Sequence, residues 1–153
     1  MEMKFITKDQ SVGKHVDIIS RYLFYYINKQ VEPYHLQKHS YKILIELYHQ
    51  EGLCQEDLVT LLKLSKADIA KSVKKLIGLG YIHKEKDTED KRIHHLYLTE
   101  KSLAIKDSII SILEDTSTIL SQNISKEDIQ ITKKVMQQMA ENILHASHTL
   151  KNS

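Results

Sequence analysis

Residues 65–98, SKADIAKSVKKLIGLGYIHKEKDTEDKRIHHLYL, constrain the fold more than any other stretch of this chain. A helical pattern opens on a Ser-x-x-Asp capping box, Ser65 with Asp68, and Gly80 follows it as a typical residue after a helix C-terminus. Two runs rich in β-branched and aromatic residues come next and flank the polar cluster DTEDKR. The segment therefore predicts a helix that begins at Ser65, ends at about Leu79 and is joined directly to a β-hairpin.

The predicted hairpin has strands over residues 81–86 and 93–98, and its turn contains one of only two arginines in the chain, Arg92. Asp90 stands two residues earlier, where its carboxylate can orient the guanidinium. An arginine fork held in this way enters a narrow A·T minor groove better than a strongly hydrated lysine does. This pair is typical of a nucleic-acid-binding wing.

Three further helices are predicted before this segment. Apolar residues recur at steps of three and four over residues 9–31, and Pro33 ends that helix. A second helix is expected over 36–50, with Gly52 in the turn after it, and a short third helix over 55–62. The third helix and the one that begins at Ser65 are separated by only a few residues, as in a helix-turn-helix.

The second helix of a helix-turn-helix is the one that enters a DNA major groove. Residues 63–95 hold nine lysines and arginines against five acidic residues, a net charge of +4, so the rest of the chain carries −2 of the overall +2. We expect DNA contacts from this helix and from the hairpin: Ser65, Lys66, Ala67, Asp68, Ala70, Lys71, Ser72, Lys74 and Lys75 on the helix, and Lys86, Asp90, Lys91 and Arg92 on the hairpin.

Two long helical patterns follow the hairpin. Residues 102–122 would extend roughly 31 Å as one continuous helix, and Ser125 with Asp128 is a capping box that opens a last helix reaching about Leu150. Together with the first helix they present apolar faces that a small winged domain cannot cover. The simplest partner is a second copy related by a two-fold axis, which would place two DNA half-sites about 10 bp apart.

From Gln55 to Ser102 the chain resembles the MarR family of bacterial transcription regulators. That family has a helix ending in Leu-x-x-x-Gly and a hydrophobic pair, an Asp-x-Arg wing, and a Leu-Thr-x-x-Gly helix start. Here these motifs are Leu76 to Gly80 with Tyr81 and Ile82, Asp90 with Arg92, and Leu98-Thr99-Glu100-Lys101. The chain departs from the pattern at Ser102, where the family has glycine.

The resemblance implies a mainly α fold with a small β-hairpin wing (α+β). A winged helix-turn-helix DNA-binding region over 36–98 would be flanked by dimerisation helices over 9–31 and 102–150, within a single MarR-like chain of residues 1–153. It further implies a dimeric, sequence-specific regulator of transcription that binds double-stranded DNA at a pseudo-palindromic operator. Family membership favours a repressor that a small-molecule effector releases.

MarR-like proteins commonly hold small anionic or phenolic ligands between the dimerisation helices and the winged region. In this chain such a pocket would use Arg21, Tyr25, Tyr41 or Tyr48. Aromatic residues at helical spacing are more often core residues, and Arg21 has ion pairing as its simpler role. These four residues are candidates for an effector pocket, although a core role for the tyrosines and an ion pair for Arg21 are the more common interpretation.

Other functions are weighed against this one. A winged helix that docks on proteins without an operator of its own is the main alternative, but it would not need the Asp90–Arg92 pair. Some relatives sense oxidants or zinc. Cys54 is more simply a buried thiol, and the spacings of His35 with His39 and of Glu141 with His145 lack further ligands, so surface histidines are the preferred interpretation.

No pattern for nucleophilic, phosphate-binding or metal-dependent catalysis is found, so we expect no enzyme activity and no cofactor. The longest apolar or aromatic run, Tyr22 to Ile27, is far shorter than the roughly 20 residues of a membrane span. The N-terminal residues MEMKFITKDQ lack the apolar region of a signal peptide. A cytoplasmic protein with no membrane partner is expected.

Overall fold

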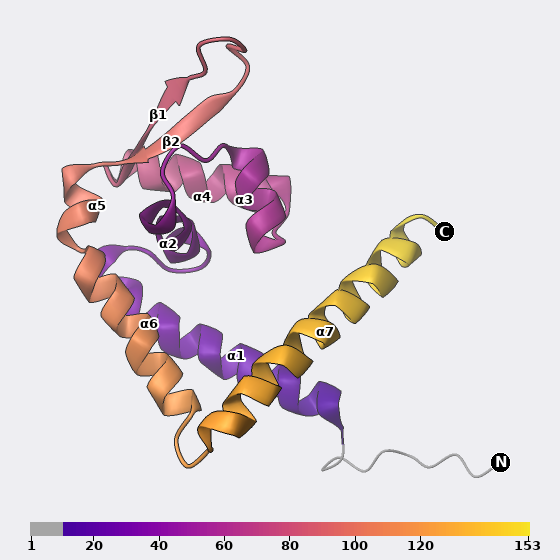
Figure 1. The fold of residues 1–153 in the computed structure, drawn as a ribbon. Coiled ribbons are helices and arrows are strands. Elements are labelled where there is room, and N and C mark those ends of the chain that lie inside the picture. Colours follow the sequence, from indigo (N-terminus) through magenta and orange to yellow (C-terminus); the bar gives the residue numbers. More distant parts are fainter. Residues whose placement is uncertain (1–10) are drawn as a thin grey trace. The chain divides into compact units, whose positions relative to one another are not determined.

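The computed structural model describes residues 11–153, which cluster into two compact units (Figure 1). The first unit ends at Glu114, and the second comprises Asp115–Ser153. The first unit contains the helices and the hairpin that the sequence assigns to a winged helix-turn-helix. The predicted start of the first helix at Asp9 lies outside the described residues.

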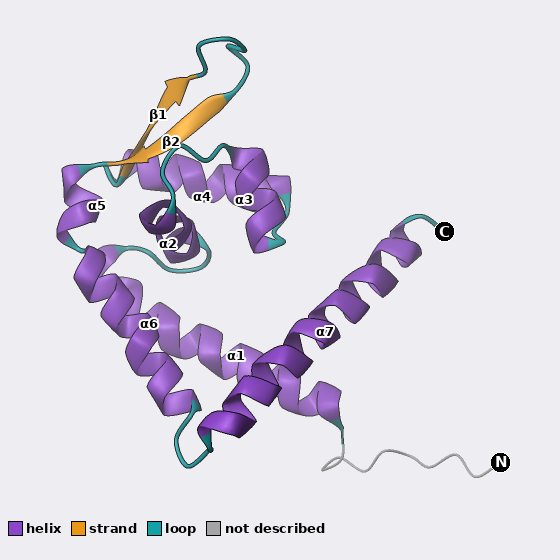
Figure 2. Cartoon of the chain, in the orientation of Figure 1, coloured by secondary structure: helices purple, strands orange, loops and turns teal. Residues whose placement is uncertain are grey.

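Helices dominate, and one two-stranded antiparallel sheet is present among the described residues (Figure 2). The elements, in chain order, are α1 (Val12–Val31), the 3-10 helix η2 (Glu32–Tyr34), α2 (Ser40–His49), α3 (Gln55–Leu62), α4 (Lys66–Gly78), β1 (Ile82–Lys86), β2 (His94–Leu98), α5 (Glu100–Ala104), α6 (Lys106–Leu120) and α7 (Lys126–Lys151). The predicted fold class, mainly α with a β-hairpin wing, is confirmed.

The core of the first unit is formed mainly by apolar side chains at helical spacing in α2, α3 and α4 and by one residue from each strand, with further members from α1, α6 and the segment before α2. Its fully covered members include Leu36, Ile43, Leu44, Leu47, Leu58, Ile69, Leu76, Ile82 and Leu96. Burial of one such side chain contributes about 1.5–3 kcal/mol relative to an exposed position. The contacts therefore fix the helix-turn-helix and the base of the hairpin to one another.

Both ends of α4 are stabilised as the sequence predicts. Ser65 is the N-cap, and its Oγ accepts a hydrogen bond of 3.0 Å from the backbone N–H of Asp68. Gly80 follows the C-terminus with a φ of +78°, in the left-handed region that glycine adopts without steric cost. The Lys101 ammonium donates to the Leu79 carbonyl at 2.5 Å and so covers an end that carries partial negative charge.

The hairpin pairs β1 and β2 in antiparallel register, with Ile82 opposite Leu98 and Lys86 opposite His94. Its second strand is also tied to the loop after α2, because the Gly52 N–H donates to the Leu96 carbonyl at 2.8 Å and the Leu96 N–H donates to the Leu53 carbonyl at 2.9 Å. The hairpin base is thus hydrogen-bonded to the helical part of the first unit as well as packed on it.

The predicted start of the second helix at Leu36 is wrong, since α2 begins at Ser40. Lys38 has a φ of +64°, which no α-helix accommodates. Its backbone N–H donates instead to the side-chain oxygen of Asn28 on α1. A contact between residues ten positions apart therefore replaces the expected first turn.

The predicted continuous helix over 102–122 is also wrong. It is divided into α5 and α6 at Ile105. The Tyr48 hydroxyl donates a hydrogen bond of 2.7 Å to the Ser102 carbonyl, which in a continuous helix would accept from the N–H of residue 106. The helical pattern is real on both sides, but a side chain from α2 takes part at the junction.

The second unit consists of the C-terminal end of α6 and the long helix α7. The predicted capping of α7 is found, because Ser125 Oγ accepts a hydrogen bond of 3.1 Å from the Asp128 N–H. Along α7 the apolar side chains of Ile131, Val135, Met136, Met139 and Ile143 are exposed. Over residues 11–153, no helix combines the length and the apolar character that crossing a bilayer requires.

Candidate nucleic-acid interface

Helices α3 and α4 form the helix-turn-helix, and three residues connect them. Lys63 takes a φ of +55°, and Ser65 then caps the N-terminus of α4. Leu58 on α3 and Ile69 on α4 are both fully buried in the shared core. Local backbone geometry and apolar packing together set how the outer face of α4 is presented.

The outer face of α4 is polar and basic, as predicted. The exposed residues include most of the helix positions expected to contact DNA: Ser65, Lys66, Ala67, Asp68, Ala70, Lys71, Lys74 and Lys75. Burial, together with Lys38, lowers the pKa of Lys75.

Ser72 was expected among the DNA contacts on the outer face of α4. It is 8% exposed and lies on the core side of the helix. It stands three residues after Ile69 and four before Leu76, which are both fully buried. Residues at these spacings share one helix face, so the direction of Ser72 follows from its neighbours. This orientation differs from the outer-face position that the sequence predicted for Ser72.

The turn of the hairpin is organised by Asp87. One oxygen of its carboxylate accepts hydrogen bonds from the backbone N–H groups of Glu89 at 2.9 Å and Asp90 at 2.8 Å. The other oxygen pairs with the His95 ring at 2.7 Å. The Asp90 N–H and the His95 ring hold the pKa of Asp87 at about 2, so it is ionised at neutral pH.

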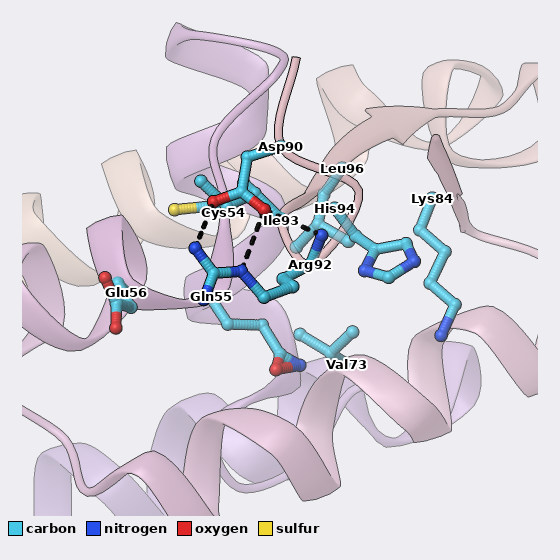
Figure 3. A pocket seen from close by; sticks show the side chains of 10 residues that line it. All are labelled: Cys54, Gln55, Glu56, Val73, Lys84, Asp90, Arg92, Ile93, His94 and Leu96. Carbon is cyan, nitrogen blue, oxygen red and sulfur yellow. Dashed lines mark hydrogen bonds and ion pairs between the residues drawn. The ribbon is translucent and has the colours of Figure 1, made fainter. Parts of the chain in front are cut away.

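Asp90 holds the Arg92 guanidinium as the sequence predicts. Arg92 Nε donates to Asp90 Oδ1 at 3.0 Å, and a terminal nitrogen donates to Oδ2 at 2.9 Å (Figure 3). The Arg92 backbone N–H also donates to Oδ1 at 3.0 Å. These contacts lower the pKa of Asp90 and raise the pKa of Arg92. The arginine side chain is 90% exposed and oriented but not covered.

A hollow of about 560 Å³ lies between the hairpin and the helix-turn-helix (Figure 3). Its lining includes Gln55 and Glu56 from α3, Val73 from α4, and Lys84, Arg92 and His94 from the hairpin. A second hollow of about 370 Å³ is lined by Ala70 and Lys74 on α4 together with Lys84 on β1. The predicted hairpin residues Asp90 and Arg92 border the first hollow, and the predicted helix residues Ala70 and Lys74 border the second.

Several residues at this surface were not among the sequence candidates. Lys84 alternates with the predicted Lys86 along β1, so the period of two in a strand is a signal that places both on one face. Gln55 lies eleven positions before the first residue of α4, and no local sequence signal marks it. The pairing of Asp87 with His95 joins residues eight positions apart, and only the hairpin register brings them together.

The four effector candidates occupy different environments. Arg21 pairs with Asp17 one helical turn earlier at 3.0 Å, and Tyr25 on the same helix is exposed. Tyr41 is buried in the core, which raises its pKa. Tyr48 is partly covered, and burial raises its pKa to about 12 while its hydroxyl binds the Ser102 carbonyl. An effector site at these residues stays a prediction.

The histidine and cysteine candidates are placed as follows. His35 and His39 do not share a helix face as their spacing suggested, because both lie in the turns between α1 and α2 and His35 has a φ of +61°. Among the described residues, no three His, Cys, Asp or Glu side chains are grouped so as to hold a metal ion. Cys54 is half-buried at the N-cap of α3, where its backbone N–H donates to the Asp57 carboxylate at 2.9 Å.

Comparisons with known proteins agree with this geometry. Residues 36–94 match the model of the MarR family. A curated relative from Bacillus subtilis (strain 168), described as the uncharacterized HTH-type transcriptional regulator YybA, is 24% identical over 130 residues, which cover 85% of this chain and 87% of the relative.

Solved structures have the same fold. A MarR protein from Peptoclostridium difficile DA00132 is 29% identical, with a TM-score of 0.84 and 94% of each chain covered. A MarR family transcriptional regulator from Listeria monocytogenes, complexed with 26mer DNA, has a TM-score of 0.86 at 22% identity, with 94% of this chain and 95% of that chain covered.

Proposed function

This chain belongs to the MarR family, and we propose that it is a dimeric, sequence-specific DNA-binding regulator of transcription. It acts as a repressor whose hold on a pseudo-palindromic operator is relieved by a small anionic or phenolic effector. Such a regulator works on double-stranded DNA in the cytoplasm and needs neither a catalytic group nor a membrane. The related Listeria protein was crystallised with DNA, which supports the same use of the fold here.

One observation carries the proposal: the Asp90–Arg92 pair on the hairpin. The guanidinium is fixed by a two-bond fork to Asp90, yet its side chain is 90% exposed. Solvent screens an exposed ion pair and so weakens its contribution to stability, which makes protein stability a poor reason to hold an arginine in this geometry. An oriented, solvent-facing guanidinium suits insertion into a minor groove or a contact with phosphate.

The basic face of α4 supplies the second half of the interface. Lys66, Lys71 and Lys74 are exposed on a helix whose opposite face is held in the core by Ile69 and Leu76. In a helix-turn-helix, this second helix contacts base edges and phosphates in the major groove. The helix and the hairpin together provide the two contact regions of a winged helix-turn-helix.

Exposed apolar side chains support assembly of two copies. On α1 they include Val12, Val16 and Ile19, and on α7 they include Ile131, Val135 and Ile143. Exposed apolar side chains repeated along a helix in this way are typical of protein–protein contact. A two-fold dimer would cover these faces and present two winged regions to half-sites about 10 bp apart.

The main alternative is a winged helix that docks on a protein and has no operator. The fork between Asp90 and Arg92 favours DNA, because it orients a cation toward solvent without covering it with apolar surface. A docking surface would instead be expected to have buried aromatic or aliphatic anchors at its centre.

The test measures binding to duplex DNA from the region upstream of the coding sequence. Fluorescence anisotropy gives the affinity at each of a series of salt concentrations. We expect the logarithm of affinity to fall by about 0.9 per phosphate contact for each decade of salt. In a dimer, Lys71→Ala removes one lysine from each half-site and should reduce that slope by about 2. The matched control Lys133→Ala removes one lysine from α7 and should leave the slope unchanged.

A scrambled duplex of the same length and composition is the specificity control. Equal affinity for both duplexes would argue against an operator-binding regulator. A flat salt dependence would show that phosphates are not the contacted groups, and the proposed function would be wrong.

A further inference from the structure

His95 connects the hairpin turn to the body of the first unit through both of its ring nitrogens. Nδ1 lies 2.7 Å from the carbonyl oxygen of Gly52, in the loop between α2 and α3. Nε2 lies 2.7 Å from Oδ1 of Asp87, at the start of the hairpin turn. The His95 and Asp87 side chains are 31% and 28% exposed, so each is about two-thirds covered.

Both partners of the His95 ring are acceptors. A carbonyl oxygen and an ionised carboxylate offer lone pairs and no proton, whereas a neutral imidazole has one donor and one acceptor nitrogen. Only the imidazolium, with a proton on each nitrogen, makes both hydrogen bonds at once. Loss of one proton would leave a ring lone pair facing an oxygen lone pair at either Gly52 or Asp87.

The contact continues from Asp87 to the arginine. The carboxylate oxygen of Asp87 that does not face His95 accepts the N–H groups of Glu89 and Asp90 and thereby shapes the turn. Asp90 then holds the Arg92 guanidinium by two side-chain bonds. A chain of short contacts therefore runs from the loop after α2, through His95 and Asp87, to the DNA-binding arginine.

The charged groups around His95 are acidic. Besides Asp87 in the turn, Glu85 is its cross-strand partner on β1, and Asp57 on α3 acts on it through space. Glu51 in the loop before Gly52 binds the Leu98 N–H on the same strand. The hydrogen bond to Asp87, followed by that to Gly52, raises the pKa of His95 above its ordinary value of 6.5.

We propose that His95 is a positioning residue for Arg92: its charged ring braces the hairpin turn, and DNA binding weakens as the ring loses its proton. This inference rests on the proposed function. His95 touches no DNA in the proposal. It acts on Arg92 only through Asp87 and the turn.

The direction of the pH effect follows from the shifts. Because the pKa of His95 is raised in the folded protein, the brace is complete below pH 6.5 and is lost as the pH rises through the raised value. The pKa of Asp87 is about 2, so this carboxylate stays ionised between pH 6 and pH 9. Within that range His95, and not Asp87, is the member of the pair that titrates.

The test measures operator affinity of the full chain by fluorescence anisotropy from pH 6 to pH 9 at constant salt. We expect affinity to fall by about threefold to tenfold over this range, the effect of losing about one hydrogen bond's net contribution. His95→Gln should bind at every pH as the parent does at high pH, with a flat profile. His148→Gln is the control, because it removes an exposed histidine from α7, away from the hairpin, and should keep the parent's profile.

NMR of the free protein provides a readout that does not need DNA. The His95 ring protons should titrate with a pKa above 6.5, and the Arg92 Nε–H signal, sharp at low pH, should broaden by exchange as His95 loses its proton. Asp87→Asn, which removes the charge but keeps an acceptor for the turn, should lower the pKa of His95 and give the same flat binding profile.

The outcomes separate the two proposals. Failure to bind operator DNA at any pH would overturn the proposed function, while the NMR titration would still decide whether the brace exists. Operator binding with the same pH profile in the parent and in His95→Gln would overturn the positioning role. If His95→Gln lowers thermal stability strongly, the Asp87→Asn profile decides the question in its place.

Discussion

Replacement of Arg92 by alanine separates a role in DNA binding from a role in the fold. The side chain is 90% exposed and donates two hydrogen bonds to Asp90. Because solvent screens an exposed ion pair, its loss should change the free energy of unfolding little. The melting temperature should therefore fall by no more than a few degrees.

The effect on DNA should be much larger. An arginine held in a fork loses little side-chain entropy when it contacts a groove or phosphate. Loss of such an arginine typically costs about 1–3 kcal/mol of binding free energy. That range is about a 5-fold to 150-fold increase in Kd at 25 °C. Arg92→Lys keeps the charge but cannot form the two-bond fork, so it should recover only part of the affinity.

Anisotropy with operator DNA and thermal unfolding by circular dichroism are the two assays, applied to the same preparations. We expect an increased Kd, a relaxed preference for A·T pairs at the operator edges and a nearly unchanged melting temperature. An unchanged Kd would remove the hairpin from the DNA interface. An increase in Kd that is accompanied by a large fall in melting temperature would show that Arg92 acts through the fold.

Two further outcomes test the fold and the assembly. Gly80→Ala should lower the free energy of unfolding by about 1 kcal/mol, because φ is +78° there while the nearest atom to an added Cβ, Lys101 Cδ, lies 3.9 Å away, so the cost is one of backbone conformation and not of space; thermal unfolding measures it, and an equally stable variant would contradict the reasoning. Truncation after Gln122 removes α7 and its exposed apolar side chains and should give monomers in analytical ultracentrifugation, whereas a stable truncated dimer would show that the interface lies elsewhere.

Local signals in the sequence predicted most of the helix-turn-helix and the hairpin. The bounds of α3 agree with the prediction to the residue, and Ser65, Ser125 and Gly80 occupy the caps and turn expected of them. Such features depend on residues within three or four positions of one another, so the local sequence is enough to predict them. The Asp90–Arg92 fork is of the same kind, because its two members are only two residues apart.

The two errors in helix bounds both arise from contacts between distant residues. The start of α2 was displaced by a hydrogen bond between Lys38 and Asn28, and the long helix was divided where Tyr48 reaches the Ser102 carbonyl. Ser72 differs, since its burial follows from its spacing to Ile69 and Leu76 and was available from the helical period.

Short-range spacing and side-chain chemistry were enough to predict the element types, the caps, the basic outer face of α4 and the arginine pair. Packing in three dimensions was needed to show that the hairpin and helices α3 and α4 border one hollow, and that His95 lies between the Gly52 carbonyl and the Asp87 carboxylate. The hairpin register and the packed core bring those groups together from positions up to 43 residues apart. Spacing along the chain does not predict such long-range contacts. They arise from the burial of apolar faces far from the groups themselves.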